Sequence, residues 1–127
     1  MRVVDLNQVQ IDWLLAVAYV YMQNGKHDEA ISLLELVLSN YNRNLDAIRG
    51  LGFCYLESRR FEDCIKACQR FLLLSQEMPT EPLALSRVHL ILAKANKKLG
   101  RLPEARNAML TYRAMTESIA DQRAVTE

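Results

Sequence analysis

The chain has 127 residues, of which 50% are hydrophobic and 24% charged, and its formal net charge is +1. This length and hydrophobic content predict one domain with a modest core, and the near-neutral charge gives no overall preference for nucleic acid. No apolar run approaches the roughly 20 residues that span a bilayer, and the N-terminus lacks the apolar region and cleavage site of a secretory signal. We therefore expect a cytoplasmic protein without membrane insertion.

A turn that recurs three times organises the sequence, at residues 23–31, 57–65 and 98–106. Each copy combines a tight turn, an acidic side chain at the start of the next segment and a small residue shortly after it. Acidic groups are favoured in the first turn of a helix because they face the positive end of the helix dipole. Each copy therefore marks the middle of a helix–turn–helix unit, and the scarcity of glycine and proline favours an all-α chain.

Alignment of the turns gives units over residues 11–44, 45–78 and 86–118. The first two start 34 residues apart, and an insertion at about 75–85 separates the last two. Pro79 and Pro82 must interrupt any helix there, and Thr80 is the expected N-cap of the next helix, with Pro82 in its first turn. Residues 119–127 form a polar tail, although we hypothesise that the helix over 103–117 continues toward Ala120 and caps the array.

Apolar residues recur three, four and seven apart within each unit, which is the helical period. Small residues occupy the positions where paired helices must approach closely: Ala18, Ala30, Gly52, Cys64, Ala93 and Ala105. This 34-residue pattern resembles the tetratricopeptide repeat over residues 11–118. The resemblance implies a single domain of three repeats that form a short right-handed superhelix, an α-α solenoid.

Three residues depart from the repeat pattern. Arg59 stands where glycine is usual, so the second turn either avoids positive φ or accepts strain. His89 and Asn96 occupy positions where large apolar residues are expected, which makes the third unit the least regular.

No residue pattern indicates a catalytic or metal site. Cys54, Cys64 and Cys68 lie within apolar helical pattern, as expected for buried, reduced thiols. Cys64 and Cys68 share a helix face and could bind a metal only with further converging ligands, so core packing is favoured. The chain lacks phosphate-loop, dinucleotide-binding and nucleophile-elbow motifs. We therefore expect a binding protein without a cofactor, and not an enzyme.

The repeat resemblance implies a groove lined by the first helix of each unit. Carried onto this chain, its inner positions are Asp12, Leu15, Tyr19, Met22, Gln23, Asp46, Arg49, Phe53, Leu56, Glu57, Arg87, Leu90, Lys94, Lys97 and Lys98. One end of this groove is apolar and aromatic, and the other is basic. The basic end lacks the interleaved aromatic residues typical of nucleic-acid binding.

The first helix carries a second apolar stripe, Leu15, Tyr19 and Met22, beside its core positions. Another segment of the chain or a partner must cover this stripe, and a protein partner is favoured because little of the chain remains at that end. Two alternatives stay open: a homodimer that uses this stripe as its interface, and a scaffold or adaptor that binds an unrelated peptide.

Leu15 and Tyr19 replace the Lys and Asn that repeat clamps for heat-shock chaperone tails require, which argues against that class. Three short repeats with an apolar groove instead resemble the chaperones of bacterial type III secretion, in particular the YscY type. The residues that carry this resemblance lie at 47–51, 90–94 and 100–108. It implies a bacterial cytoplasmic chaperone that holds a small secreted partner of the YscX type.

Overall fold

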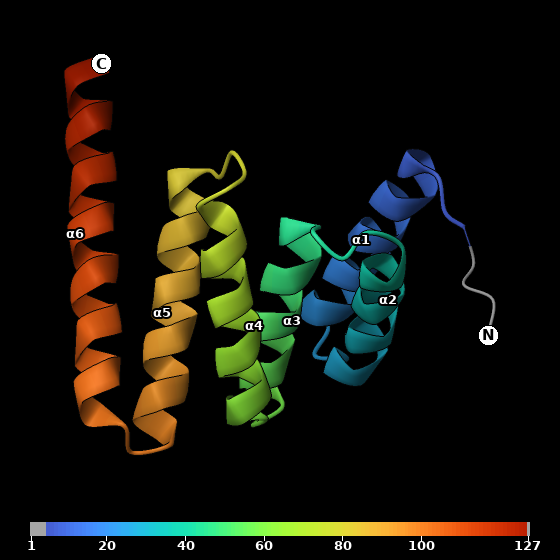
Figure 1. Cartoon of the computed structure of the whole chain (residues 1–127), viewed down its shortest axis with the longest axis horizontal. Coiled ribbons are helices and arrows are strands. Elements are labelled where there is room, and N and C mark those ends of the chain that lie inside the picture. Colours follow the sequence, from blue (N-terminus) through green and yellow to red (C-terminus); the bar gives the residue numbers. More distant parts are fainter. Residues whose placement is uncertain (1–4, 127) are drawn as a thin grey trace.

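The computed structural model describes residues 5–126, and over this range it contains six helices and no strand. The helices are α1 (Gln8–Gln23), α2 (His27–Asn40), α3 (Leu45–Glu57), α4 (Phe61–Ser75), α5 (Pro82–Lys98) and α6 (Leu102–Thr126). They stand in a row from α1 and α2 at one end to α6 at the other (Figure 1). The prediction of an all-α chain is confirmed.

Three helix pairs, α1–α2, α3–α4 and α5–α6, pack as helix–turn–helix units, and α2–α3 and α4–α5 contacts join one unit to the next. The first helices are also in contact, since α3 packs against both α1 and α5. This arrangement places α1, α3 and α5 beside one another, so their side chains can form one continuous surface.

Polar side chains set the starts of α1 and α3. Asn7 and Gln10 form a capping box, in which the Gln10 amide donates to Asn7 Oδ1 (2.8 Å) and the Asn7 amide to Gln10 Oε1 (3.0 Å). Asn44 accepts a hydrogen bond from the Ala47 amide at 2.9 Å. These bonds satisfy backbone donors that the first turn of a helix leaves without partners.

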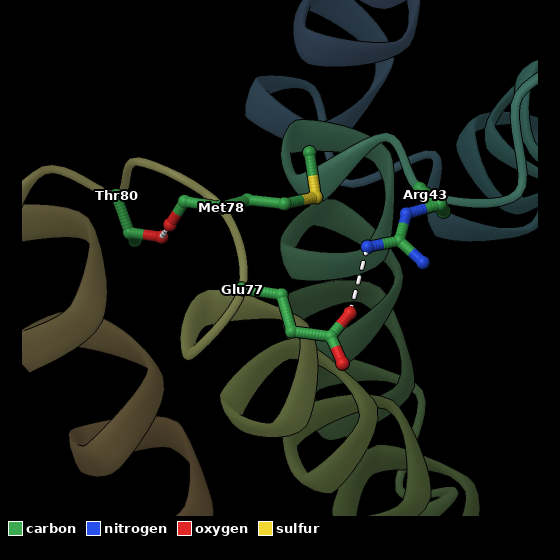
Figure 2. Close-up of polar contacts among 4 residues, drawn as sticks. All are labelled: Arg43, Glu77, Met78 and Thr80. Carbon is green, nitrogen blue, oxygen red and sulfur yellow. Dashed lines mark hydrogen bonds and ion pairs between the residues drawn. The ribbon is translucent and has the colours of Figure 1, made fainter.

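The expected N-cap of α5 is corrected by the structure. Glu81, with φ −66° and ψ 134°, is the N-cap, and Pro82 is the first helical residue, as expected. The hydroxyl of Thr80 donates instead to the Met78 carbonyl at 3.0 Å (Figure 2). Because the residue before a proline is restricted to extended conformations, the cap falls at position 81, and Thr80 lies one residue too early.

The core consists of two adjoining clusters. The first joins α1, α2 and α3, and the second joins α3, α4 and α5 through Ile48, Phe71 and Val88, each 1% exposed. The small residues Ala18, Ala30 and Cys64 are fully buried where paired helices approach each other. In α5 the buried Asn96 donates Nδ2 to the Leu92 carbonyl at 3.0 Å, which explains how an amide is accommodated at an apolar position.

The three turns share one left-handed residue. Gly25 and Gly100 have φ of 74° and 75°, and Arg59 has φ of 61° at the equivalent place in the second turn. Of the two possibilities for Arg59, the structure shows that it adopts positive φ. A side chain in this region is strained by contact between Cβ and the backbone.

Replacing Arg59 with glycine should therefore raise the free energy of unfolding by about 0.5–1 kcal/mol, because strain relief exceeds the entropy that glycine adds to the unfolded chain. The reverse change, Gly25→Arg, should lower it by a similar amount. No atom lies within 4 Å of a Cβ added at Gly25, so its cost is conformational and not steric. Urea unfolding monitored by circular dichroism measures both, and a destabilised Arg59→Gly variant would contradict the strain argument.

The loops between units are tied together at the molecular surface. Arg43, after α2, forms an ion pair with Glu77, after α4, with 2.8 Å between Nη2 and Oε2 (Figure 2). Nearby, Arg70 donates to the Asn42 carbonyl. The side chains of Arg43 and Glu77 are 55% and 63% exposed, so the pair contributes at most about 1 kcal/mol. It orients the loops more than it stabilises the fold.

The expectation of a separate polar tail at residues 119–127 is wrong over the part the structure describes, because α6 continues to Thr126. The sequence holds no glycine or proline after Pro103, so nothing terminates the helix. Residues 120–125 are exposed, and several of them are polar. The long α6 closes the C-terminal end of the row (Figure 1).

All three cysteines are buried, as predicted. Burial, and to a smaller extent the charge of Glu57, raise the pKa of Cys54 to about 11 from 9.0. A hydrogen bond with Cys64 and burial raise the pKa of Cys68. Since the folded state holds these thiols protonated more strongly than the unfolded state does, their contribution is complete below pH 9 and is lost as pH rises toward 11.

We expect the free energy of unfolding to fall by about 1 kcal/mol for Cys54 alone between pH 8 and pH 10. Urea unfolding of the wild type and Cys54→Ala at both pH values isolates this part, because the variant should lose less stability on the same change. An identical pH dependence in the two proteins would contradict the account.

Candidate functional site

A cavity of about 380 Å³ lies where the first helices meet. It is lined by Leu15, Tyr19, Met22, Gln23, Leu34, Asp46, Arg49, Gly50, Phe53, Arg87 and Ile91. Side chains from α1, α3 and α5 supply most of this wall, and α2 supplies Leu34. We call this cavity the groove. Six of the predicted site residues line it: Leu15, Tyr19, Met22, Arg49, Phe53 and Arg87.

Apolar and aromatic groups dominate one side of the groove. Leu15, Tyr19 and Met22 follow one another at helical spacing along α1, and the side chain of Tyr19 is 58% exposed. Across from them, Phe53 is half-buried and meets the ring of His27 edge to face, with 6.1 Å between ring centroids. This support from α2 limits the positions available to the Phe53 ring.

Gly50 gives the groove its depth. A Cβ at this position would lie 3.0 Å from Leu34 Cδ1 and 3.4 Å from Cδ2. The missing side chain therefore lets Leu34 approach α3 and leaves space above both residues. Sequence reasoning missed Gly50 and Leu34, because neither occupies an inner position of the repeat pattern.

Charged residues stand at the groove's edge. Arg49 approaches Asp46 at 3.6 Å between Nη2 and Oδ1, which is too long for a strong ion pair. The side chain of Arg49 is 32% exposed, and Arg87 is exposed on α5. Both guanidinium groups can therefore bind an acidic or carbonyl group of an occupant.

A second cavity, of about 630 Å³, gathers the predicted basic residues. Its lining residues are Leu56, Glu57, Arg59, Phe61, Lys94, Lys97 and Lys98. They come from the end of α3, the turn that follows it, the start of α4 and the last turns of α5. We call this the basic cavity. Three lysines on one helix give it a positive field beside the apolar Leu56 and Phe61.

Two predicted site residues line neither cavity. Asp12 accepts a hydrogen bond from Gln8 Nε2 at 2.8 Å and is exposed on α1. Leu90 is half-buried, and its neighbour Ile91 lines the groove in its place. Ile91 lies four residues after Arg87 and so shares its face of α5, a spacing that the sequence already contained.

Other candidate chemistry finds little support between residues 5 and 126. No group of three or more His, Cys, Asp or Glu side chains in this range is placed to hold a metal ion. None of the helices in the same range is both long and apolar enough to cross a bilayer. Burial lowers the pKa of His89, which lines a separate polar cleft between α4, α5 and α6.

Comparisons with known proteins agree on the fold. The tetratricopeptide repeat family model matches residues 21–77, from the end of α1 to the loop after α4. No curated protein matches the chain. The solved structure of PcrH, determined in complex with the chaperone binding region of PopB, has a TM-score of 0.77 with 21% sequence identity. This alignment covers 89% of the present chain and 86% of PcrH.

A second similar structure is a variant form of the nearly identical TPR-like repeats from Podosopora anserina, assigned as a kinesin light chain. Its TM-score is 0.70 with 18% identity, and the alignment covers 91% of this chain and 58% of that one. At these identities the likeness establishes the fold alone. The protein is therefore an all-α solenoid of the tetratricopeptide type, a class defined by stacked helix pairs.

Proposed function

We propose that the protein binds a segment of a partner protein in the groove and acts as a chaperone of bacterial type III secretion. The observation that carries this is the groove itself, in which exposed Tyr19 and half-buried Phe53 face solvent from adjoining first helices. Aromatic and methionine side chains are common anchors at protein interfaces. The structural likeness to PcrH, solved with the chaperone binding region of PopB, supports a segment-binding role.

The occupant we infer is an amphipathic helix or an extended segment. Its apolar side chains would contact Leu15, Tyr19, Met22 and Phe53, and burial of these groups would supply most of the binding free energy. Binding is stoichiometric and needs no ATP. The resemblance to the YscY type suggests that the partner is a small secreted protein of the YscX type and that capture takes place in the bacterial cytoplasm.

The basic cavity would set the orientation of the bound segment by meeting its acidic groups. Lys94, Lys97 and Lys98 are exposed on α5, so they act on the encounter rate more than on the lifetime of the complex. The triple change to glutamate should slow association about tenfold at low salt and leave dissociation nearly unchanged. Stopped-flow or biolayer measurements at two salt concentrations test this, and a selective effect on dissociation would contradict it.

Affinity capture from the native host, followed by mass spectrometry and the absolute mass of the eluted complex, tests the proposed function. The account predicts one small secretion protein at a fixed stoichiometry. Recovery of an unrelated peptide-bearing protein would instead support the scaffold alternative. Recovery of this chain without any partner would contradict the chaperone assignment.

A further inference from the structure

The outward side of α1 carries exposed apolar residues that the groove does not use. Val9, Trp13 and Val20 are 76%, 64% and 55% exposed, and Ala16 between them is also exposed. None of these four residues lines any of the cavities described above. We call Val9, Trp13, Ala16 and Val20 the outer seam.

The outer seam lies opposite the core side of α1. A helix turns by about 100° per residue, so positions 9, 13, 16 and 20 fall within an arc of about 60°, roughly opposite Ile11, Leu14 and Ala18. Those three are the buried residues of the helix. Of the helices within residues 5–126, only α2 and α3 pack against α1, so the described structure leaves the seam open.

The spacing of the seam is that of a coiled-coil interface. Steps of four, three and four residues repeat every seven, which keeps a stripe facing a neighbouring helix over several turns. The groove stripe, Leu15, Tyr19 and Met22, occupies a different side of α1. The helix can therefore pair with another helix along the seam while the groove stays open.

We propose that the outer seam pairs with the same seam of a second copy of this chain, with the two α1 helices antiparallel. In the register centred between Leu14 and Leu15, Val9 meets Val20 of the second copy and Trp13 meets Ala16. Large and small side chains then alternate across the interface, which is the condition for close packing without voids or overlap.

Charge also favours a second copy. A two-fold symmetric interface uses the same surface on both chains, so like charges on it are costly. Asp12 is the only charged residue of α1, and the antiparallel register places it opposite Val17 of the second copy and not opposite its own equivalent. The seam itself contains no charged residue.

The two ends of the row differ in the way this proposal requires. A solenoid needs a polar outer face at each end that solvent meets. The exposed surface of α6 is largely polar, with Glu104, Arg106, Arg113, Glu117 and Asp121 among its residues. The outer seam of α1 is apolar, as expected for an end that packs against another chain.

A pairwise exchange of Trp13 and Ala16 tests this register. Trp13→Ala removes the large side chain from both contacts, and Ala16→Trp places two tryptophans against each other. Each variant alone should dimerise at least tenfold more weakly than the wild type, within the range found for interface anchors. Mixed together, the two variants should form a heterodimer with near wild-type affinity, because every contact again joins a large side chain to a small one.

Sedimentation equilibrium of the full chain over a wide concentration range gives these dissociation constants. Leu110→Ala, at a 57% exposed residue of α6, is the matched control and should dimerise normally. Circular dichroism verifies that each variant is folded; both exchanged positions are exposed, so helix content should be unchanged. As a second readout, the emission of Trp13, the only tryptophan of the chain, should shift to shorter wavelength as the wild type dimerises.

Three outcomes would overturn the proposal. They are a wild type that remains monomeric at all concentrations, a dimer that both single variants leave intact, and single variants that do not recover when mixed. Blue-shifted Trp13 emission in a monomer would show instead that another segment of the chain covers the seam, and would also overturn it.

Discussion

Replacing Phe71 with alanine should lower the free energy of unfolding by about 3–5 kcal/mol, the usual cost of a large aromatic deletion in a core. The side chain of Phe71 is 1% exposed and belongs to the cluster that joins α3, α4 and α5. Since folded domains have only about 5–15 kcal/mol of stability, this loss would bring the protein close to unfolding at room temperature.

Leu73→Ala is the matched control, because Leu73 lies two residues further along α4 and is 64% exposed. It should change stability by about 0.5 kcal/mol or less. Urea unfolding monitored by circular dichroism compares the two variants directly. Similar, small effects at both positions would contradict the described orientation of α4.

The double change Tyr19→Ala and Phe53→Ala should weaken partner binding by about 2–5 kcal/mol, given about 1–3 kcal/mol for each anchor. Both residues line the groove, from α1 and α3 respectively. Tyr19 is exposed and its removal should leave the fold intact, whereas Phe53 packs against His27 and contributes to stability as well. Calorimetric titration with the captured partner measures the change.

Two controls separate binding from folding in this experiment. Tyr19→Ala alone should weaken binding without lowering the unfolding midpoint. Leu73→Ala, at an exposed position on α4 outside both cavities, should bind with wild-type affinity. If the double variant is folded and binds normally, the groove is not the binding surface.

Much of the fold could be predicted from the sequence because its turns are local signals. Gly25 and Gly100 mark left-handed positions that few other residues adopt easily, and the structure places both there. Arg59 shows the limit of this reasoning, since neighbouring packing imposes the same turn on a residue that disfavours it. The continuation of α6 beyond residue 118 was underestimated, because polarity indicates exposure and does not by itself end a helix.

The candidate site was only partly accessible from sequence. Inner positions of the repeat identified Tyr19 and Phe53, which do line the groove, but Gly50 enters the site through the space that its missing side chain leaves. The outer seam was not recognised at all. Because α1 is apolar almost all round, periodicity alone cannot tell which stripe packs inside, and only the positions of α2 and α3 reveal that Trp13 is left exposed.

Site-specific photocross-linking tests the central claim, capture of a partner segment in the groove, most directly. A benzophenone amino acid would replace Tyr19 in the groove in one variant and the exposed Leu73 on α4 in another, and each would be irradiated in the native host. The account predicts a cross-link from position 19 to one segment of one partner protein, and none to that protein from position 73. A partner that cross-links from position 73 and not from position 19 would contradict it.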